Sequence, residues 1–188
     1  MHFFRPTHPR DARAVRSKRR TLALATYAVL FVAAVGCGSD GPMAPGFGSG
    51  NVTASGAVTV SGSGISLFQL IPGGSGSVFQ VVIAQVSQSA NAWQVQIADY
   101  SGRLEAGTYN LSPQSAGSTD PTANFYYSSG STTQLFNSTS GQLVITSSSS
   151  SEVRGTFNFT ATDPDGGAAS VSAHGSFIAP CSPGFGCP

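Results

Sequence analysis

The sequence predicts an all-β fold, an antiparallel β-sandwich or a meander β-barrel of roughly nine strands. From Asn51 onward, short apolar runs alternate with polar residues, as in strands that bury one face. Clusters of Gly, Ser, Pro, Asn and Asp separate these runs and are typical of turns. A sustained helical period does not occur in this region. We therefore expect mostly sequential strands joined by short loops.

A basic segment and an apolar run precede the predicted β-domain. Seven Arg and Lys residues lie within residues 1–20, ahead of an uncharged run at 22–35. This run suits a signal peptide and is shorter than the about 20 residues of a membrane-spanning helix. It ends in Ala-Val-Gly-Cys at residues 34–37, which resembles the lipobox of bacterial lipoproteins.

The lipobox resemblance implies that Cys37 becomes the first residue of the mature protein. Its acyl chains, palmitate among them, would then anchor the protein to the membrane. Gly38 rather than Asp follows, which by resemblance to the sorting signals of two-membrane bacteria implies the outer membrane. The alternatives are an uncleaved anchor and an ordinary signal peptide with a cysteine nearby. Arg19 and Arg20 loosely resemble a twin-arginine signal, but the residues after them do not, so we expect general secretion.

Charge is unevenly distributed along the chain. Residues 37–188 retain two basic residues, Arg103 and Arg154, against seven acidic ones, a formal net charge of −5. Because phosphate binding needs clustered Lys and Arg, we predict no nucleic-acid partner.

Composition changes divide the chain into four segments. The segments are a lipoprotein signal peptide at 1–36, a tether at 37–50, the β-domain at 51–180 and a disulfide-closed tail at 181–188. The tether is rich in Gly, Pro and Ser, as in a flexible connection, and the β-domain is long enough for one domain with a single core.

Five strands are expected in the first half of the β-domain. They lie at residues 52–60, 65–71, 78–86, 93–97 and 107–111. We predict that Ser and Gly at residues 61–64 turn the chain between the first two. The third is apolar on both faces, as in a strand covered on two sides, and should form a hairpin with the fourth.

The second half contains further alternating runs. They lie at residues 124–127, 133–136, 143–145, 153–161 and 171–177. Phe157 and Phe159 fall on one face of their strand, which predicts that both rings pack against the neighbouring strands. Asn158 and Thr160 should then face solvent.

These strands carry motifs that resemble a family. The motifs are Gly-Thr-Tyr at 107–109, Phe-Tyr-Tyr at 125–127, a strand at 140–146, Gly-Thr-Phe-Asn-Phe at 155–159 and Gly-Ser-Phe at 175–177. Their order is similar to a group of uncharacterised bacterial lipoprotein domains over about residues 51–178. The resemblance implies an exported β-domain and supplies no activity.

The cysteine count supports the lipidation of Cys37. Three cysteines leave one unpaired in an exported protein, unless Cys37 is lipidated and Cys181 pairs with Cys187. The residues between the last two are turn formers, and the small ring would stabilise by roughly 2 kcal/mol. A redox or metal pair is the alternative, but the two-residue spacing and a nearby His are missing.

Catalytic chemistry would depend on His174, which is the only histidine after the leader. No Gly-x-Ser-x-Gly elbow accompanies it, and His174 should lie on the solvent face of its strand. We therefore predict no catalytic residue and no cofactor.

Acidic residues near a turn suggest one metal alternative. Asp163, Asp165 and the glycines after them look like a calcium loop, which Asp99, Glu105 or Asp120 would have to complete. An ordinary hairpin turn explains the same residues. We predict no metal site.

Aromatic residues suggest a glycan surface as a further alternative. Its candidates are Trp93, Tyr100, Tyr109, Tyr126 and Tyr127, although Trp93 should be buried because it shares parity with apolar neighbours. Tyr126 and Tyr127 are adjacent, so one of them must point outward.

The function that we expect is a non-catalytic, lipid-anchored domain for binding, adhesion or envelope structure. Its partners would be the membrane through the lipid, and a glycan or an envelope protein. The alternatives are a β-barrel carrier for a lipid or small ligand, and an envelope hydrolase.

Overall fold

The computed structural model describes residues 46–73, 76–85, 91–113, 119–182 and 187. The predicted signal peptide, Cys37 and most of the predicted tether lie outside the described residues. Within those described ranges, no helix is long and apolar enough to cross a membrane.

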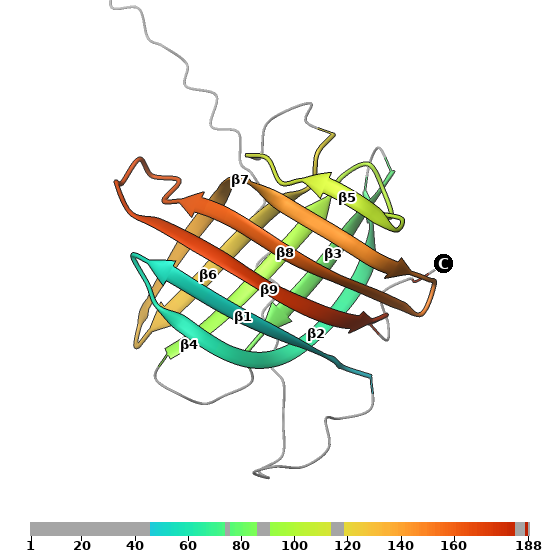
Figure 1. Cartoon of the computed structure of the whole chain (residues 1–188), viewed down its shortest axis with the longest axis horizontal. Coiled ribbons are helices and arrows are strands. Elements are labelled where there is room, and N and C mark those ends of the chain that lie inside the picture. Colours follow the sequence, from blue (N-terminus) through green and yellow to red (C-terminus); the bar gives the residue numbers. More distant parts are fainter. Residues whose placement is uncertain (1–45, 74–75, 86–90, 114–118, 183–186, 188) are drawn as a thin grey trace, which may run out of the picture. The chain divides into compact units, whose positions relative to one another are not determined.

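Nine antiparallel strands make up the described part of the chain (Figure 1). They are β1 (Gly48–Gly56), β2 (Val60–Gly73), β3 (Gly76–Ala84), β4 (Asn91–Asp99), β5 (Gly107–Asn110), β6 (Thr122–Ser129), β7 (Thr132–Ser148), β8 (Glu152–Thr162) and β9 (Ser170–Pro180). The all-β prediction is therefore confirmed. The first strand begins before the expected domain boundary at residue 51.

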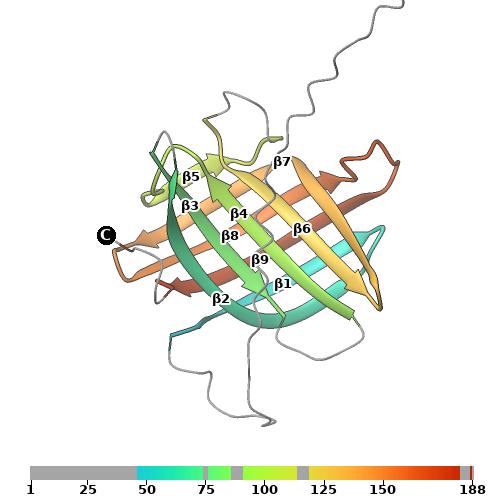
Figure 2. The same cartoon turned by 180° about the vertical axis from the view of Figure 1, so that it is seen from behind.

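Eight of the strands close into a barrel, so of the two predicted architectures the barrel is correct and the sandwich is wrong. The strands follow the order β7-β6-β4-β3-β2-β1-β9-β8, and pairing between β7 and β8 closes the ring. Figures 1 and 2 show opposite walls, with β1, β8 and β9 on one side and β3, β4 and β6 on the other. The predicted hairpin of β3 and β4 is confirmed, with Val81 opposite Ile97.

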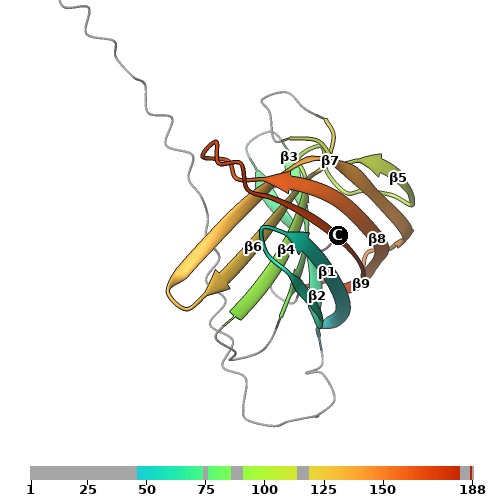
Figure 3. The same cartoon turned by 60° about the vertical axis from the view of Figure 1, so that its left-hand side comes forward.

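The ninth strand, β5, joins the barrel through β7. We expected separate strands at 133–136 and 143–145, which is wrong, because both belong to the one long strand β7. One edge of β7 pairs first with β6 and then with β5, while β8 pairs along the other edge. Figure 3 shows β5 beside the far half of β7, away from the β6–β7 hairpin.

Ser138 marks the point where β7 changes partners. A register shift between Ser138 and Ser140 bends the strand there. The buried Ser138 hydroxyl accepts a hydrogen bond from the Ala123 N–H and donates one to the Ser112 carbonyl, both at 3.0 Å. This side chain thus satisfies main-chain groups that the interrupted ladder leaves without a partner.

The predicted turn at residues 61–64 is wrong. β2 runs straight through these residues, paired with β1, and the turn lies at 57–59. Gly56 enters that turn with a φ of 116°, which favours glycine. Gly64 serves close packing instead, because a Cβ there would collide with the Ala84 carbonyl on β3.

Side chains fill the interior of the barrel. Phe68, Phe79, Phe125 and Phe136, from four different strands, are each at most 2% exposed. They pack as two tilted pairs, Phe68 with Phe79 and Phe125 with Phe136, with ring centroids 6.0 and 6.3 Å apart. Burial of this apolar surface is the main favourable contribution to folding.

The prediction for β8 is confirmed. Phe157 and Phe159 are each 3% exposed and lie in the core with their centroids 5.8 Å apart. Asn158 and Thr160, between and after them, are exposed on the outer face.

The two ends of the barrel carry different connections. The turns at 57–59, 130–131 and 163–169 gather at one end, on the left of Figure 1, which we call the mouth. β1 begins and β9 finishes at the opposite end, which we call the base, together with the β2–β3 and β4–β5 connections.

Candidate functional site

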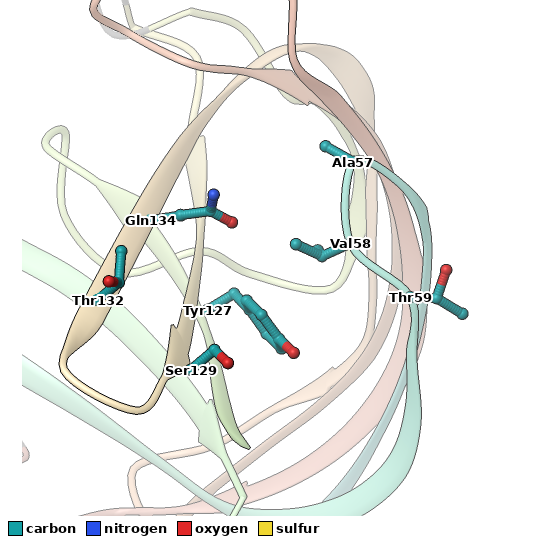
Figure 4. Close-up of a pocket in the computed structure, with 7 residues that line it drawn as sticks. All are labelled: Ala57, Val58, Thr59, Tyr127, Ser129, Thr132 and Gln134. Carbon is teal, nitrogen blue, oxygen red and sulfur yellow. The ribbon is translucent and has the colours of Figure 1, made fainter. Parts of the chain in front are cut away.

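A pocket of about 470 Å³ opens at the mouth, between the β1–β2 turn and the β6–β7 hairpin. We call it the mouth pocket. It is lined by Ala57, Val58, Thr59, Tyr127, Ser129, Thr132 and Gln134. In Figure 4, Tyr127, Gln134 and Val58 point into the space between the two turns, whereas Thr59 points away.

The lining residues of β6 and β7 occupy inward-facing positions of the barrel. Along β6, Phe125 is buried in the core, Tyr127 is half-buried against it and Ser129 is exposed at the rim. Across the ladder, Gln134 lies opposite Tyr127 and Thr132 lies opposite Ser129. The interior therefore changes from apolar to polar as these two strands approach the mouth.

Apolar groups underlie this polar rim. Trp93 lies opposite Tyr127 in the register of β4 and β6 and is only 4% exposed. Val58, in the β1–β2 turn, is 7% exposed and belongs to the same core. Small-molecule sites commonly combine such an apolar base with a few polar groups.

The polar groups of the mouth pocket are available to a ligand. Tyr109 and Tyr126 each donate their hydroxyl hydrogen to an oxygen of the chain. By contrast, the Tyr127 hydroxyl and the Gln134 amide make no hydrogen bond within the described part of the chain. None of the seven lining residues is Asp, Glu, Lys, Arg or His, so the pocket is a neutral polar site.

The base, in contrast, is closed by packed side chains. Arg103, in the β4–β5 connection, lies with its Cζ 5.9 Å from the centroid of the Phe68 ring, within cation–π range. Its Nε donates to the Ser148 Oγ at 3.2 Å, and that hydroxyl donates to the Leu104 carbonyl at 2.7 Å. The Leu104 side chain is buried in the core.

The two C-terminal cysteines also lie at the base. A disulfide joins Cys181 to Cys187, whose Cα atoms are 6.1 Å apart. Cys181 continues directly from β9 and forms a parallel bridge with Phe68, and the Ser182 N–H donates to the Phe68 carbonyl at 2.8 Å. Cys181 and Ser182 therefore pair with β2 beyond the point where β1 begins, and these two residues extend the barrel wall.

His174 lies on the outer face of β9 and is exposed, as predicted. It borders a surface groove of about 270 Å³ across β7, β8 and β9. Ser140 and Ser172 line the same groove, but its described lining includes no acidic side chain. The structure therefore does not bring a Ser-His-Asp arrangement together at this place.

The acidic residues after β8 form a turn. The Asp165 N–H donates to the Asp163 Oδ1 at 2.8 Å, and the Asp163 N–H donates to the Ala169 carbonyl at 3.1 Å. These bonds confirm the interpretation as a hairpin turn. Among the described residues, no three His, Cys, Asp or Glu side chains gather as metal ligands.

The candidate aromatic residues do not share one surface. Trp93 and Tyr127 face the interior, as described above, whereas Tyr126 faces outward and donates to the Gln96 Oε1 at 3.3 Å. Burial raises the pKa of the Tyr126 phenol, and the nearby Tyr100 raises it further. Tyr100 is 51% exposed. Only Tyr127 contributes to the mouth pocket.

Sequence reasoning did not identify Val58, Thr132 or Gln134 as site residues. Nothing in their local sequence distinguishes them, because they meet Tyr127 only through barrel closure and the register of β6 and β7. The one available signal was the spacing from Phe125 to Tyr127, which places both on one face of a strand.

Comparison with known proteins supplies a family and no function. No curated protein and no solved structure matches the chain significantly. Residues 81–179, from β3 to β9, match the model of a domain of unknown function, DUF6252. This range includes Trp93, Tyr127 and Gln134 and excludes the β1–β2 turn. Because the match covers more than half of the chain, the protein belongs to the DUF6252 family of domains of unknown function.

Proposed function

We propose that this protein is an exported lipoprotein whose barrel is a non-catalytic binding domain, held at the envelope by acyl chains on Cys37. The basic flank, the apolar run at 22–35 and the small residues before Cys37 support processing and lipidation at this residue. Several acyl chains on one residue give stable attachment, whereas a single chain is marginal.

The observation that carries the binding role is the difference between the two ends of the barrel. The chain enters β1 at the base, where Arg103 lies over the Phe68 ring and Leu104 and the two disulfide-linked cysteines pack against the core. The mouth, with its free polar side chains, lies at the other end of β1. The mouth is therefore at the end of the barrel opposite to the one where the chain from Cys37 enters β1.

The length of the tether limits how far the barrel can lie from the membrane. Residues 37–47, between the proposed lipid and the first strand, span at most about 40 Å when fully extended. Their Gly, Pro and Ser content suits a flexible connection. The mouth can then reach ligands that do not approach the bilayer itself.

The packed core makes an enclosed lipid the weaker alternative. A carrier needs interior volume, and here aromatic side chains such as Phe68 and Phe125 occupy the middle of the barrel. A small ligand at the mouth requires no such displacement. An envelope hydrolase is the remaining rival, and it would have to use His174 on the outer face.

The anchor is tested on the protein as the producing cell processes it. Mass spectrometry of the mature N-terminus should show an acylated Cys37, and membrane fractionation should place the protein in the outer membrane. A Cys37→Ser variant should be released from the membrane. A free thiol at residue 37 in the mature protein contradicts the proposal, and residence in the inner membrane contradicts the sorting.

The absence of catalysis is tested separately with chromogenic ester and glycoside substrates. We expect no turnover above that of a mock preparation. Turnover that is present in the natural protein and lost on His174→Ala would show that the domain is a hydrolase.

A further inference from the structure

We infer that the mouth pocket binds the end of an uncharged carbohydrate chain, with the Tyr127 ring and the Gln134 amide as the main contacts. The inference rests on the proposed role as a binding domain and adds the ligand class and the site. The binding role alone does not specify this site, because a partner can bind a barrel on any of its surfaces.

The dimensions of the pocket suit a small ligand. Its volume of about 470 Å³ falls within the roughly 300–1,000 Å³ that is usual for small-molecule sites. It opens between two turns at the mouth, so that one end of a chain can enter while the rest continues into solvent (Figure 4).

The lining matches the two kinds of surface that a sugar presents. A sugar ring has C–H faces, which pack on aromatic rings, and hydroxyls, which both donate and accept hydrogen bonds. Tyr127 offers a half-buried ring with a free hydroxyl, and the Gln134 amide can donate and accept at once. Ser129 and Thr132 add two exposed hydroxyls at the rim.

The charge of the pocket restricts the ligand class. An anionic sugar or a phosphate would need a cation, and no Lys or Arg is among the described lining residues. A cationic ligand would need a carboxylate, and the described lining has none. The pocket therefore favours a neutral ligand that is rich in hydroxyl groups.

The contact residues are held on rigid elements. Tyr127 lies in the ladder between Trp93 of β4 and Gln134 of β7, and its ring packs against the core. Binding then requires little ordering of the protein, which lowers the entropic cost of association. Tyr126, the residue before Tyr127, points outward, and its hydroxyl donates a hydrogen bond to the Gln96 Oε1. It therefore provides a matched control on the same strand.

The experiment measures binding of neutral glycans to the processed protein. A glycan array identifies binders, and isothermal titration calorimetry with the best oligosaccharide gives the affinity. Tyr127→Ala and Gln134→Ala should each weaken binding by about tenfold or more, which corresponds to the loss of roughly 1.4 kcal/mol. Tyr126→Ala should leave the affinity within about twofold of the natural protein.

Folding controls keep the test decisive. Tyr127 is half-buried, so the melting temperature of its variant is compared with that of the natural protein. Gln134 is exposed, and its variant should fold normally. If folded Gln134→Ala and Tyr127→Ala proteins bind like the natural protein while Tyr126→Ala does not, the glycan site lies on the outer face and the inference is wrong.

Two other outcomes also overturn the inference. Binding of uncharged nucleosides without binding of any glycan would show that the ligand class is wrong. Binding of neither class would exclude the mouth pocket as a carbohydrate site. The proposed function fails by a different measurement, because a lipid on Cys37 and membrane residence are scored independently of any glycan.

Discussion

Two Gly-x-Phe motifs interlock across β8 and β9. Gly155 lies opposite Phe177, and Phe157 lies opposite Gly175, so each ring faces the glycine of the other strand. A Cβ on Gly155 would lie 2.9 Å from the Phe177 Cζ and 2.5 Å from the Val144 carbonyl oxygen. The glycines therefore provide the space that the two rings occupy.

This packing reverses the usual effect of replacing glycine by alanine. At an unstrained position, Gly→Ala stabilises a protein by about 0.4–1 kcal/mol, because it restricts the unfolded chain. Gly155→Ala must instead displace a buried ring and a backbone carbonyl, and such overpacking costs about 1–3 kcal/mol. Gly175→Ala should cost at least as much, because its Cβ would lie 2.7 Å from the Phe157 Cζ and would also collide with the Asn51 carbonyl.

Gly62 on β2 is the matched control. A Cβ there would have Trp93 as its nearest neighbour, at 3.7 Å from the Nε1, which is ordinary van der Waals contact. Gly62→Ala should therefore be neutral, or stabilising by up to about 1 kcal/mol.

The assay is urea unfolding at constant temperature, followed by tryptophan fluorescence. Midpoints should fall for Gly155→Ala and Gly175→Ala and should not fall for Gly62→Ala, with unchanged slopes. A double-mutant cycle identifies the cause, because Gly155→Ala should cost less in a Phe177→Leu background. A Gly155→Ala protein as stable as the natural one would refute the interlocking of ring and glycine.

Three further predictions concern single side chains. Phe157→Ala should lower the free energy of unfolding in urea by about 3–5 kcal/mol, and Asn158→Ala by less than about 0.5 kcal/mol; equal losses would contradict the assigned faces. Ser138→Ala leaves buried main-chain groups unpaired and should cost about 1–3 kcal/mol, so an unchanged melting temperature argues against its bridging role. Burial raises the pKa of Tyr126, so the unfolded chain loses this proton first and stability should fall above about pH 10. Tyr126→Phe should flatten that loss, measured by urea unfolding at about pH 9 and 11.

The strands could be predicted because their burial follows a period of two. β8 is the clearest case, since buried and exposed residues alternate from Val153 to Ala161. Closure of the barrel could not be predicted in the same way. A sandwich and a barrel show the same alternation of buried and exposed residues. Which of the two architectures forms depends on the pairing of β7 with β8 and on the bend at Ser138.

The wrong prediction of a turn at residues 61–64 has a similar origin. Ser and Gly in succession are a strong turn signal, but that signal describes only local freedom of the backbone. Here Gly64 is required by the close approach of β3, which is a tertiary contact. The actual turn is made by Gly56 and residues 57–59, where the local signal is weaker.

The candidate site was the least predictable part, because its members come from separate strands. The sequence required that one of Tyr126 and Tyr127 point outward, and the parity of Phe125 then assigns Tyr127 to the interior. It did not show that Gln134 lies opposite Tyr127. That pairing is fixed by the β6–β7 hairpin and its turn at Gly130, where φ is 60°.

The mouth departs from the rule that inward-facing positions of a small barrel are apolar. Elsewhere the interior positions carry buried side chains such as Phe79 and Ile83, and at the base Leu104 completes the core. At the mouth, Gln134 and Thr132 occupy inward positions with polar side chains that bond to nothing in the described chain. Both side chains are exposed, so water satisfies their polar groups when no ligand is bound, and apolar residues in their place would leave apolar surface at the open end. Polar side chains that water alone satisfies can exchange that water for a ligand without loss of folding stability, which is why we place the proposed carbohydrate site at the mouth and not at the packed base.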